Sequence, residues 1–207
     1  MSVEDQDRLR RLAGTWGTSL DAETAGRLLG YGQLLLQWNA RINLTGANSL
    51  AELIDEHFPD AFAIASALGD ATAVVDVGSG GGLPAVPLAI LVPRINVLMI
   101  EPINKKVAFL RTAIREAGLG DRVSALGQRY EGQRPVGHPT GFDLAMSRAT
   151  FAPADWLARC RPLLRRDGRA LALSSEERIS VPEGWRLDGS LSYAGGRRWL
   201  LSYLCST

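Results

Sequence analysis

A cluster of glycines near the middle of the chain follows a short apolar segment and precedes a proline. The glycines are Gly78, Gly80, Gly81 and Gly82. Residues 73–77 are apolar except for Asp76, which is typical of a strand buried on both faces. Glycine allows positive φ and close approach of a ligand, and Pro84 suits the first turn of a helix. The segment therefore predicts a strand, a tight turn and a helix, with a ligand site at the carboxyl edge of a sheet.

The spacing of this turn distinguishes between two kinds of nucleotide cofactor. A dinucleotide site needs Gly-x-Gly-x-x-Gly, but Leu83 stands where the third glycine would be. The order found here, an acid and then Gly-x-Gly-x-Gly, is similar to the first motif of S-adenosylmethionine (AdoMet) methyltransferases. That motif holds the methionine half of the cofactor, and here it covers Asp76, Gly78, Ser79, Gly80 and Gly82. A buried strand with an ordinary tight turn is the alternative.

A second carboxylate follows the next apolar segment. Residues 95–100 predict another buried strand, which ends at Glu101. Glu101 comes about twenty residues after the glycine turn, as expected for a carboxylate that binds a ribose. The turn and this carboxylate together indicate a nucleoside cofactor.

Two later polar segments also follow predicted strands. In the first, Tyr130 could lie along an adenine base and Glu131 could accept a hydrogen bond near it, or Arg129 and Glu131 could be a surface pair. In the second, Arg148 could make a bidentate contact to a phosphate or a guanine edge. A salt bridge at a helix end is the alternative for Arg148.

The only two lysines among 23 basic residues are Lys105 and Lys106, at the start of a predicted helix on the cofactor side. They could contact RNA phosphates, which position a substrate without reading its sequence, or form a solvated helix start. His57 lies on the apolar side of its predicted helix, a pattern that favours a packed core histidine. No histidine accompanies a serine in a recognisable hydrolase motif.

Composition indicates an ordinary globular protein. The 207 residues are 46% hydrophobic and 22% charged, and charged residues interrupt every long apolar run. The N-terminus is acidic and lacks an apolar signal core, so we expect no export. Cys160 and Cys205 have no metal-type spacing. A reduced, metal-free cytoplasmic protein is the simplest account.

Charge is divided unevenly along the chain. Residues 1–71 carry 5 basic and 10 acidic side chains, and residues 72–207 carry 18 basic and 12 acidic ones. A net charge of −5 before a net charge of +6 is compatible with nucleic-acid binding by the second segment.

The predicted elements divide the chain into a helical N-terminal extension, residues 1–70, and an α/β domain, residues 71–207. The extension has predicted helices over 3–16, over 19–39 with Ser19 as N-cap, and over 49–63 with Ser49 as N-cap. Strands are predicted near 72–77, 95–101, 123–127, 142–147, 168–174, 185–193 and 197–205, and helices near 84–92, 103–117 and 152–164. This alternation predicts a mostly parallel sheet with helices on both faces and an antiparallel last strand. Such an ending resembles that of the Rossmann-like AdoMet-dependent methyltransferase fold, which we therefore expect.

From Trp38 to Ala149 the chain resembles the bacterial 16S ribosomal RNA guanine methyltransferases that make 7-methylguanosine, the glucose-inhibited-division B family. The matching blocks are Trp38-Asn39, Asn43-Leu44-Thr45, His57 with Asp60, Asp76 to Gly80, Gly82-Leu83-Pro84, Lys105-Lys106-Val107 with Phe109-Leu110, Arg129 with Glu131, and Ser147-Arg148-Ala149. The order and spacing of these blocks are far more specific than any one of them.

The resemblance implies a set of roles. AdoMet contacts are carried over to Gly78, Leu83, Tyr130, Glu131 and Arg148, beside the motif residues, Glu101 and Arg129. Arg148 orients the reactants, and Lys105, Lys106, Asn43 and His57 face the RNA. The implied partner is 16S ribosomal RNA or the small ribosomal subunit, and the implied cofactor is AdoMet. From the sequence itself we expect no metal and no membrane association, and we expect a monomer.

Alternatives remain open at this level. The chain departs from the family pattern at Ala61, Tyr130 and Ser174-Ser175, which would suit a diverged paralogue with another RNA or a small molecule as target. A nicotinamide oxidoreductase would need the third glycine that Leu83 replaces. A non-catalytic ribosome-binding protein would keep the cofactor pocket but transfer no methyl group.

Overall fold

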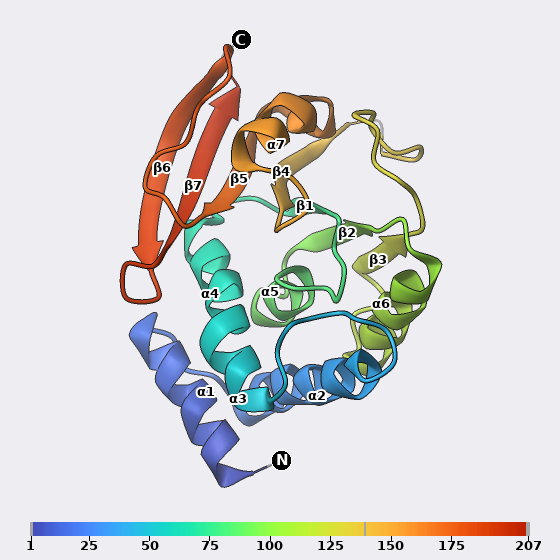
Figure 1. The fold of residues 1–207 in the computed structure, drawn as a ribbon, viewed down its shortest axis with the longest axis vertical. Helices are drawn as coiled ribbons and strands as arrows, with labels where there is room; N and C mark the ends of the chain where they lie inside the picture. Colours follow the sequence, from blue (N-terminus) through green and yellow to red (C-terminus); the bar gives the residue numbers. More distant parts are fainter. Residues whose placement is uncertain (1, 139, 206–207) are drawn as a thin grey trace.

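The computed structural model describes residues 2–138 and 140–205, which form a single mixed sheet flanked by helices (Figure 1). The strand order is β3-β2-β1-β4-β5-β7-β6. The strands are β1 (Ala73–Val77), β2 (Asn96–Ile100), β3 (Val123–Leu126), β4 (Phe142–Ser147), β5 (Leu164–Ser174), β6 (Trp185–Tyr193) and β7 (Arg198–Cys205). The helices are α1 (Val3–Thr15), α2 (Ala22–Asn39), α3 (Leu50–Glu52), α4 (Phe58–Ala67), α5 (Ala85–Leu91), α6 (Asn104–Glu116) and α7 (Pro153–Cys160).

The sheet has two parts with different pairing. Strands β1 to β5 are parallel, with β1 between β2 and β4. Strand β7 is antiparallel to both β5 and β6, and a short turn through Gly195 and Gly196 joins β6 to β7. A turn of this length can only join antiparallel neighbours, because a parallel pair needs a long crossover. The predicted Rossmann-like methyltransferase sheet with an antiparallel end is confirmed.

The elements follow the predicted order, with differences at their ends. The N-cap of α2 is Asp21, whose side chain accepts from the Thr24 N–H at 2.6 Å, so the assignment to Ser19 was wrong. Ser49 caps α3 as predicted. The predicted helix over 49–63 is divided by a π-helical turn at Leu53–His57, and Pro59 lies in the first turn of α4.

The last predicted helix is shorter than expected and the following strand is longer. Helix α7 ends at Cys160, and a 3-10 turn (Arg161–Leu163) follows it. Strand β5 begins at Leu164, four residues before the predicted start at 168. Pro162 belongs to the turn, where its missing N–H costs no α-helical hydrogen bond.

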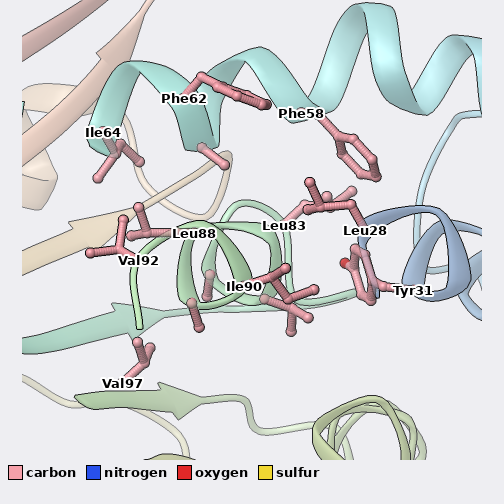
Figure 2. Close-up of a cluster of buried hydrophobic side chains, with 14 of the residues drawn as sticks. Leu28, Tyr31, Phe58, Phe62, Ile64, Leu83, Leu88, Ile90, Val92 and Val97 are labelled. Carbon is pink, nitrogen blue, oxygen red and sulfur yellow. The ribbon is translucent and has the colours of Figure 1, made fainter. Parts of the chain in front are cut away.

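Each face of the sheet has its own hydrophobic core. Helices α4, α5 and α6 cover one face, with α1 and α2 outside them, and this core runs from Leu9 to Leu200 (Figure 1). Figure 2 shows Phe58 and Phe62 of α4 above Leu88 of α5, with Tyr31 of α2 at one end of the cluster. Helix α7 covers the other face through Trp156. Residues 1–70 therefore share a core with the sheet, and the two-domain division stays a prediction.

None of the described helices, within residues 2–138 and 140–205, is both long and apolar enough to span a membrane.

A substitution of Phe58 tests whether residues 1–70 and the sheet share one core. Its ring is fully buried and stacks on Tyr31 at 6.3 Å between centroids. We expect Phe58→Ala to lower the free energy of unfolding by about 3–5 kcal/mol, because the substitution removes apolar contacts and leaves a cavity. Val136→Ala is the control, because Val136 is 98% exposed and its change should stay within about 0.5 kcal/mol. Urea titration measures both, and equal effects would contradict the shared core.

Candidate functional site

The glycine-rich turn follows β1 at the carboxyl edge of the sheet. Gly78, Gly80 and Gly82 have φ values of +76°, +55° and +81°, which glycine adopts without strain. The Gly78 N–H donates to the carbonyl of Ile100 at 2.8 Å, which ties the turn to β2. A Cβ at Gly78 would lie 2.0 Å from Thr150 Oγ1, so this position has no room for a side chain.

A cleft of about 420 Å³ lies against this turn. This volume falls within the range of small-molecule sites. Five separate stretches of the chain contribute to its walls. The lining residues are Leu44, Thr45, Gly46, His57, Gly78, Ser79, Gly80, Gly81, Leu83, Glu101, Pro102, Lys106, Arg148, Ala149 and Thr150.

Asp76 belongs to β1, two residues before the lining residue Gly78. It is 1% exposed, and its Oδ2 has no hydrogen-bond partner among the described residues. Burial raises the pKa of Asp76 from 3.8 to about 7, and the negative charge of Glu101 acts in the same direction. Ser79 and Arg148 oppose this shift of the Asp76 pKa without cancelling it. A buried acceptor without a partner is costly and indicates a place for a donor from a ligand.

Glu101 is fixed by backbone donors on both sides. Its Oε2 accepts from the Gly80 N–H and its Oε1 from the Ile103 N–H, both at 2.9 Å. A carboxylate has about four acceptor sites, so Glu101 keeps capacity for a ligand hydroxyl. Glu101 therefore lies in direct contact with the glycine turn, as the sequence predicts.

Arg148 follows β4 and is held from two sides. Its Nε lies 3.1 Å from Asp60 Oδ2, and its Nη2 lies 2.5 Å from His57 Nδ1. Its Nη1 is buried and has no partner among the described residues. Arg148 thus makes a salt bridge at a helix end, because Asp60 lies in the first turn of α4. It also keeps an unused donor nitrogen, Nη1.

Asp60 connects Arg148 to the C-terminal hairpin. Its Oδ1 accepts from the Tyr193 hydroxyl at 2.8 Å and lies 3.1 Å from Arg198 Nη1. Arg198 Nη2 also pairs with Glu56 Oε2 at 2.9 Å. Sequence reasoning missed Tyr193 and Arg198, because no local pattern relates them to residues more than 130 positions away.

His57 is half-buried and lines the cleft, so the expectation of a packed core histidine was wrong. Burial and the positive charge of Arg148 lower the His57 pKa from 6.5 to about 4. Its Nε2 lies 3.5 Å from Thr45 Oγ1. The side chain is therefore neutral at pH 7.

The remaining predicted residues divide into two groups. Lys106 lines the cleft, whereas Lys105 and Asn43 are exposed and are not among the lining residues. Arg129 and Glu131 are likewise exposed outside the lining.

Tyr130 lies outside the cleft lining as well. It is 9% exposed, belongs to the core under α7, and donates its hydroxyl hydrogen bond to the Arg159 carbonyl at 2.7 Å. A role for Tyr130 beside an adenine stays a prediction.

The helical extension supplies one wall of the cleft. The Asn39 side chain accepts from the N–H groups of Leu44 and Thr45 at 2.7 and 3.0 Å, and donates to the Thr45 carbonyl at 2.9 Å. The Tyr31 hydroxyl donates to the Gly81 carbonyl at 2.6 Å. Sequence blocks around Asn39 and Asn43 marked this segment, but their spacing alone does not place it against the glycine turn.

The fold and the cleft define a Rossmann-like methyltransferase. A SAM-dependent methyltransferase from Aquifex aeolicus is similar in fold, with a TM-score of 0.55 and 16% identity over 75% of this chain and 93% of that one. The glycopeptide N-methyltransferase MtfA is also similar, with a TM-score of 0.56 and 15% identity over 75% of this chain and 98% of that one. At these identities the likeness concerns the fold alone.

Residues 25–181 match the family GidB, described as rRNA small subunit methyltransferase G, and the chain belongs to this family. It is 35% identical to the ribosomal RNA small subunit methyltransferase G of Azoarcus sp. (strain BH72) over 82% of this chain and 80% of that protein. It is 36% identical to the protein of the same name from Sodalis glossinidius, over 87% of this chain and 88% of that protein. The family expected from the sequence blocks is confirmed.

The raised pKa of Asp76 has a consequence for stability. Between pH 3.8 and about 7 the folded protein keeps a proton that the unfolded chain has lost, so this residue lowers the free energy of unfolding as pH rises through that window. Asp76→Asn removes the titrating group. We expect the variant without AdoMet to exceed the wild type in free energy of unfolding by about 1–3 kcal/mol at pH 8, and the difference to shrink toward zero at pH 4.

Urea titrations at the two pH values measure this difference. The control is Asp70→Asn, because Asp70 is an exposed acid outside the cleft lining and should show no comparable pH dependence. An Asp76→Asn protein that is less stable than the wild type at pH 8 would contradict the burial argument.

Proposed function

We propose that the chain transfers a methyl group from AdoMet to nitrogen 7 of a guanine in 16S ribosomal RNA. One observation carries the proposal: Arg148, which lines the cleft, and Asp76, two residues before the lining residue Gly78, each have a buried polar atom without a partner in the described part of the chain. The Asp76 atom is an acceptor and the Arg148 atom is a donor. Membership in the family of small-subunit rRNA methyltransferases supports the RNA substrate.

The residues of the cleft fit AdoMet. Asp76 Oδ2 needs a donor and Arg148 Nη1 needs an acceptor, and the ammonium and carboxylate of an amino acid supply one of each. The glycine turn gives room for the backbone to approach, and Glu101 keeps acceptor sites suited to ribose hydroxyls. Within the described part of the chain, no group of three or more His, Cys, Asp and Glu side chains could hold a metal ion.

The proposed methyl transfer requires few catalytic groups from the protein. AdoMet supplies, when bound, an electrophilic methyl group. Nitrogen 7 of guanine carries a free lone pair at neutral pH, so no general base has to remove a proton from it. The residues of the chain contribute by orientation, which brings nucleophile and methyl group into line. Arg148 suits this task because Asp60 and His57 hold its guanidinium in place.

The RNA approaches over the side of the cleft where α6 begins. Lys106 lines the cleft and Lys105 is exposed beside it, so both are placed for phosphate contacts. His57 lines the cleft beside Thr45, and Asn43 precedes the lining residue Leu44, so both are placed to face the RNA. We further propose that the protein acts as a monomer in the cytoplasm on the small ribosomal subunit or its RNA.

Methyl-labelled AdoMet tests the reaction directly. The protein is incubated with small ribosomal subunits that lack the modification and, separately, with the naked 16S RNA, and the labelled nucleotide is identified by mass spectrometry. We expect label in a single guanine as 7-methylguanosine. Label on another atom, on a small molecule only, or on nothing would overturn the proposal, and intact binding to subunits without label would identify a non-catalytic protein.

Arg148→Ala tests the orienting role. We expect methyl transfer to fall about 100-fold, because a buried charged donor beside the reactants is lost. Its matched control is Arg111→Ala, since Arg111 is exposed on α6 outside the cleft lining and should retain full activity. Circular dichroism and thermal unfolding show whether the variant is folded. A folded Arg148→Ala protein with full activity would refute the assignment.

A further inference from the structure

The contact of His57 with Arg148 determines which ring nitrogen of His57 carries the proton. The Arg148 guanidinium has only donors, and its Nη2 lies 2.5 Å from His57 Nδ1. Nδ1 must therefore accept, which leaves the single ring proton of the neutral imidazole on Nε2. This assignment follows from the donor inventory of arginine and agrees with the low pKa of His57, about 4.

The Nε2–H group has spare capacity as a donor. Its neighbour Thr45 Oγ1 lies 3.5 Å away, at the outer limit of a hydrogen bond. The Thr45 hydroxyl oxygen also accepts from the Ala47 N–H at 3.2 Å. Both His57 and Thr45 line the cleft, so an acceptor on a bound ligand could replace this long contact.

The edge of guanine that carries nitrogen 7 also carries oxygen 6. Both are acceptors, whereas adenine has an amino donor in place of oxygen 6. A donor that reads oxygen 6 therefore distinguishes the two purines while nitrogen 7 stays free to react. A neutral donor suits this position, because methylation at nitrogen 7 leaves a positive charge on the ring and a cation beside it would be repelled.

We propose that the Nε2–H of His57 donates a hydrogen bond to oxygen 6 of the target guanine, which makes His57 a residue that selects guanine over adenine. The inference rests on the proposed function. It extends that function by assigning the base selection to one neutral side chain, whereas Lys105 and Lys106 supply phosphate contacts that read no sequence.

Two substitutions of His57 distinguish recognition of oxygen 6 from positioning of the Arg148 guanidinium. In His57→Asn the amide oxygen can replace Nδ1 as acceptor for Arg148, but no donor remains at the position of Nε2. In His57→Gln the amide nitrogen can replace the donor at Nε2, but the acceptor for Arg148 is lost. A residue that only positions Arg148 would tolerate Asn better than Gln, and a residue that reads oxygen 6 would tolerate Gln better than Asn.

The substrates are RNAs or reconstituted subunits in which the mapped target nucleotide is guanosine or 2-aminopurine riboside, which keeps nitrogen 7 and lacks oxygen 6. For the wild type we expect kcat/KM to be about tenfold higher on guanosine, as for one hydrogen bond. His57→Asn should lower kcat/KM on guanosine about tenfold and leave it unchanged on 2-aminopurine, with an unchanged Kd for AdoMet. His57→Gln should keep most of the preference.

The comparison of ratios cancels the different intrinsic reactivity of the two bases. Equal losses on both substrates in His57→Asn, which would leave the preference for guanosine as large as in the wild type, would overturn the inference. A wild type that methylates no guanine at nitrogen 7 would instead overturn the proposed function, so the two failures are distinguishable. Far-UV circular dichroism confirms that both variants are folded.

Discussion

The geometry of the cleft depends on the contacts of one buried carboxylate, that of Asp60. It is 2% exposed, and it joins Arg148, Arg198 and Tyr193 at distances of 3.1, 3.1 and 2.8 Å. A buried charge costs several kcal/mol unless partners compensate it, so these three groups must come together when the chain folds. The three partners come from the segment after β4 and from the β6–β7 hairpin. The position of Arg148 in the cleft is thereby coupled to the docking of the C-terminal hairpin on α4.

The helical extension is in direct contact with the glycine turn. The Tyr31 hydroxyl binds the Gly81 carbonyl at 2.6 Å, and a Cβ at Gly81 would lie 2.9 Å from Leu35 Cδ1 and 3.1 Å from the Leu44 carbonyl oxygen. The extension therefore closes directly over the backbone of the turn. It builds part of the cleft wall rather than covering a finished site, which explains why one hydrophobic core includes both Leu9 and Leu200.

The fold was predictable because its signals are local. The apolar runs at 73–77 and 95–100 and the glycines between them specify two neighbouring strands and a turn. The joining of β6 and β7 by a glycine turn required an antiparallel end. The misplaced N-cap at Ser19 has a local cause too, because Asp21 stands two residues later and is an equally good cap.

The site was predictable only in part, because its geometry depends on distant contacts. The pairing of Asp60 with Tyr193 spans 133 positions, and no periodicity encodes it. His57 ends the π-helical turn, and its contact with Arg148 spans 91 positions. The hydroxyl of Tyr130 donates to the Arg159 carbonyl, an acceptor on α7 that lies 29 positions away and that no local pattern indicates.

The charges around the cleft suit a reaction in which a positive charge moves but is not created. In the proposed reaction the sulfonium charge passes to the purine, so the site has to tolerate a cation at two neighbouring places. Arg148 is already paired with Asp60, and His57 is neutral, so neither adds an uncompensated positive charge beside the base. The Glu101 carboxylate lies against the glycine turn, where negative charge favours the cationic donor. The network that fixes Arg148 thus also neutralises it, and the orientation of the reactants and the electrostatics of the transfer have the same structural origin.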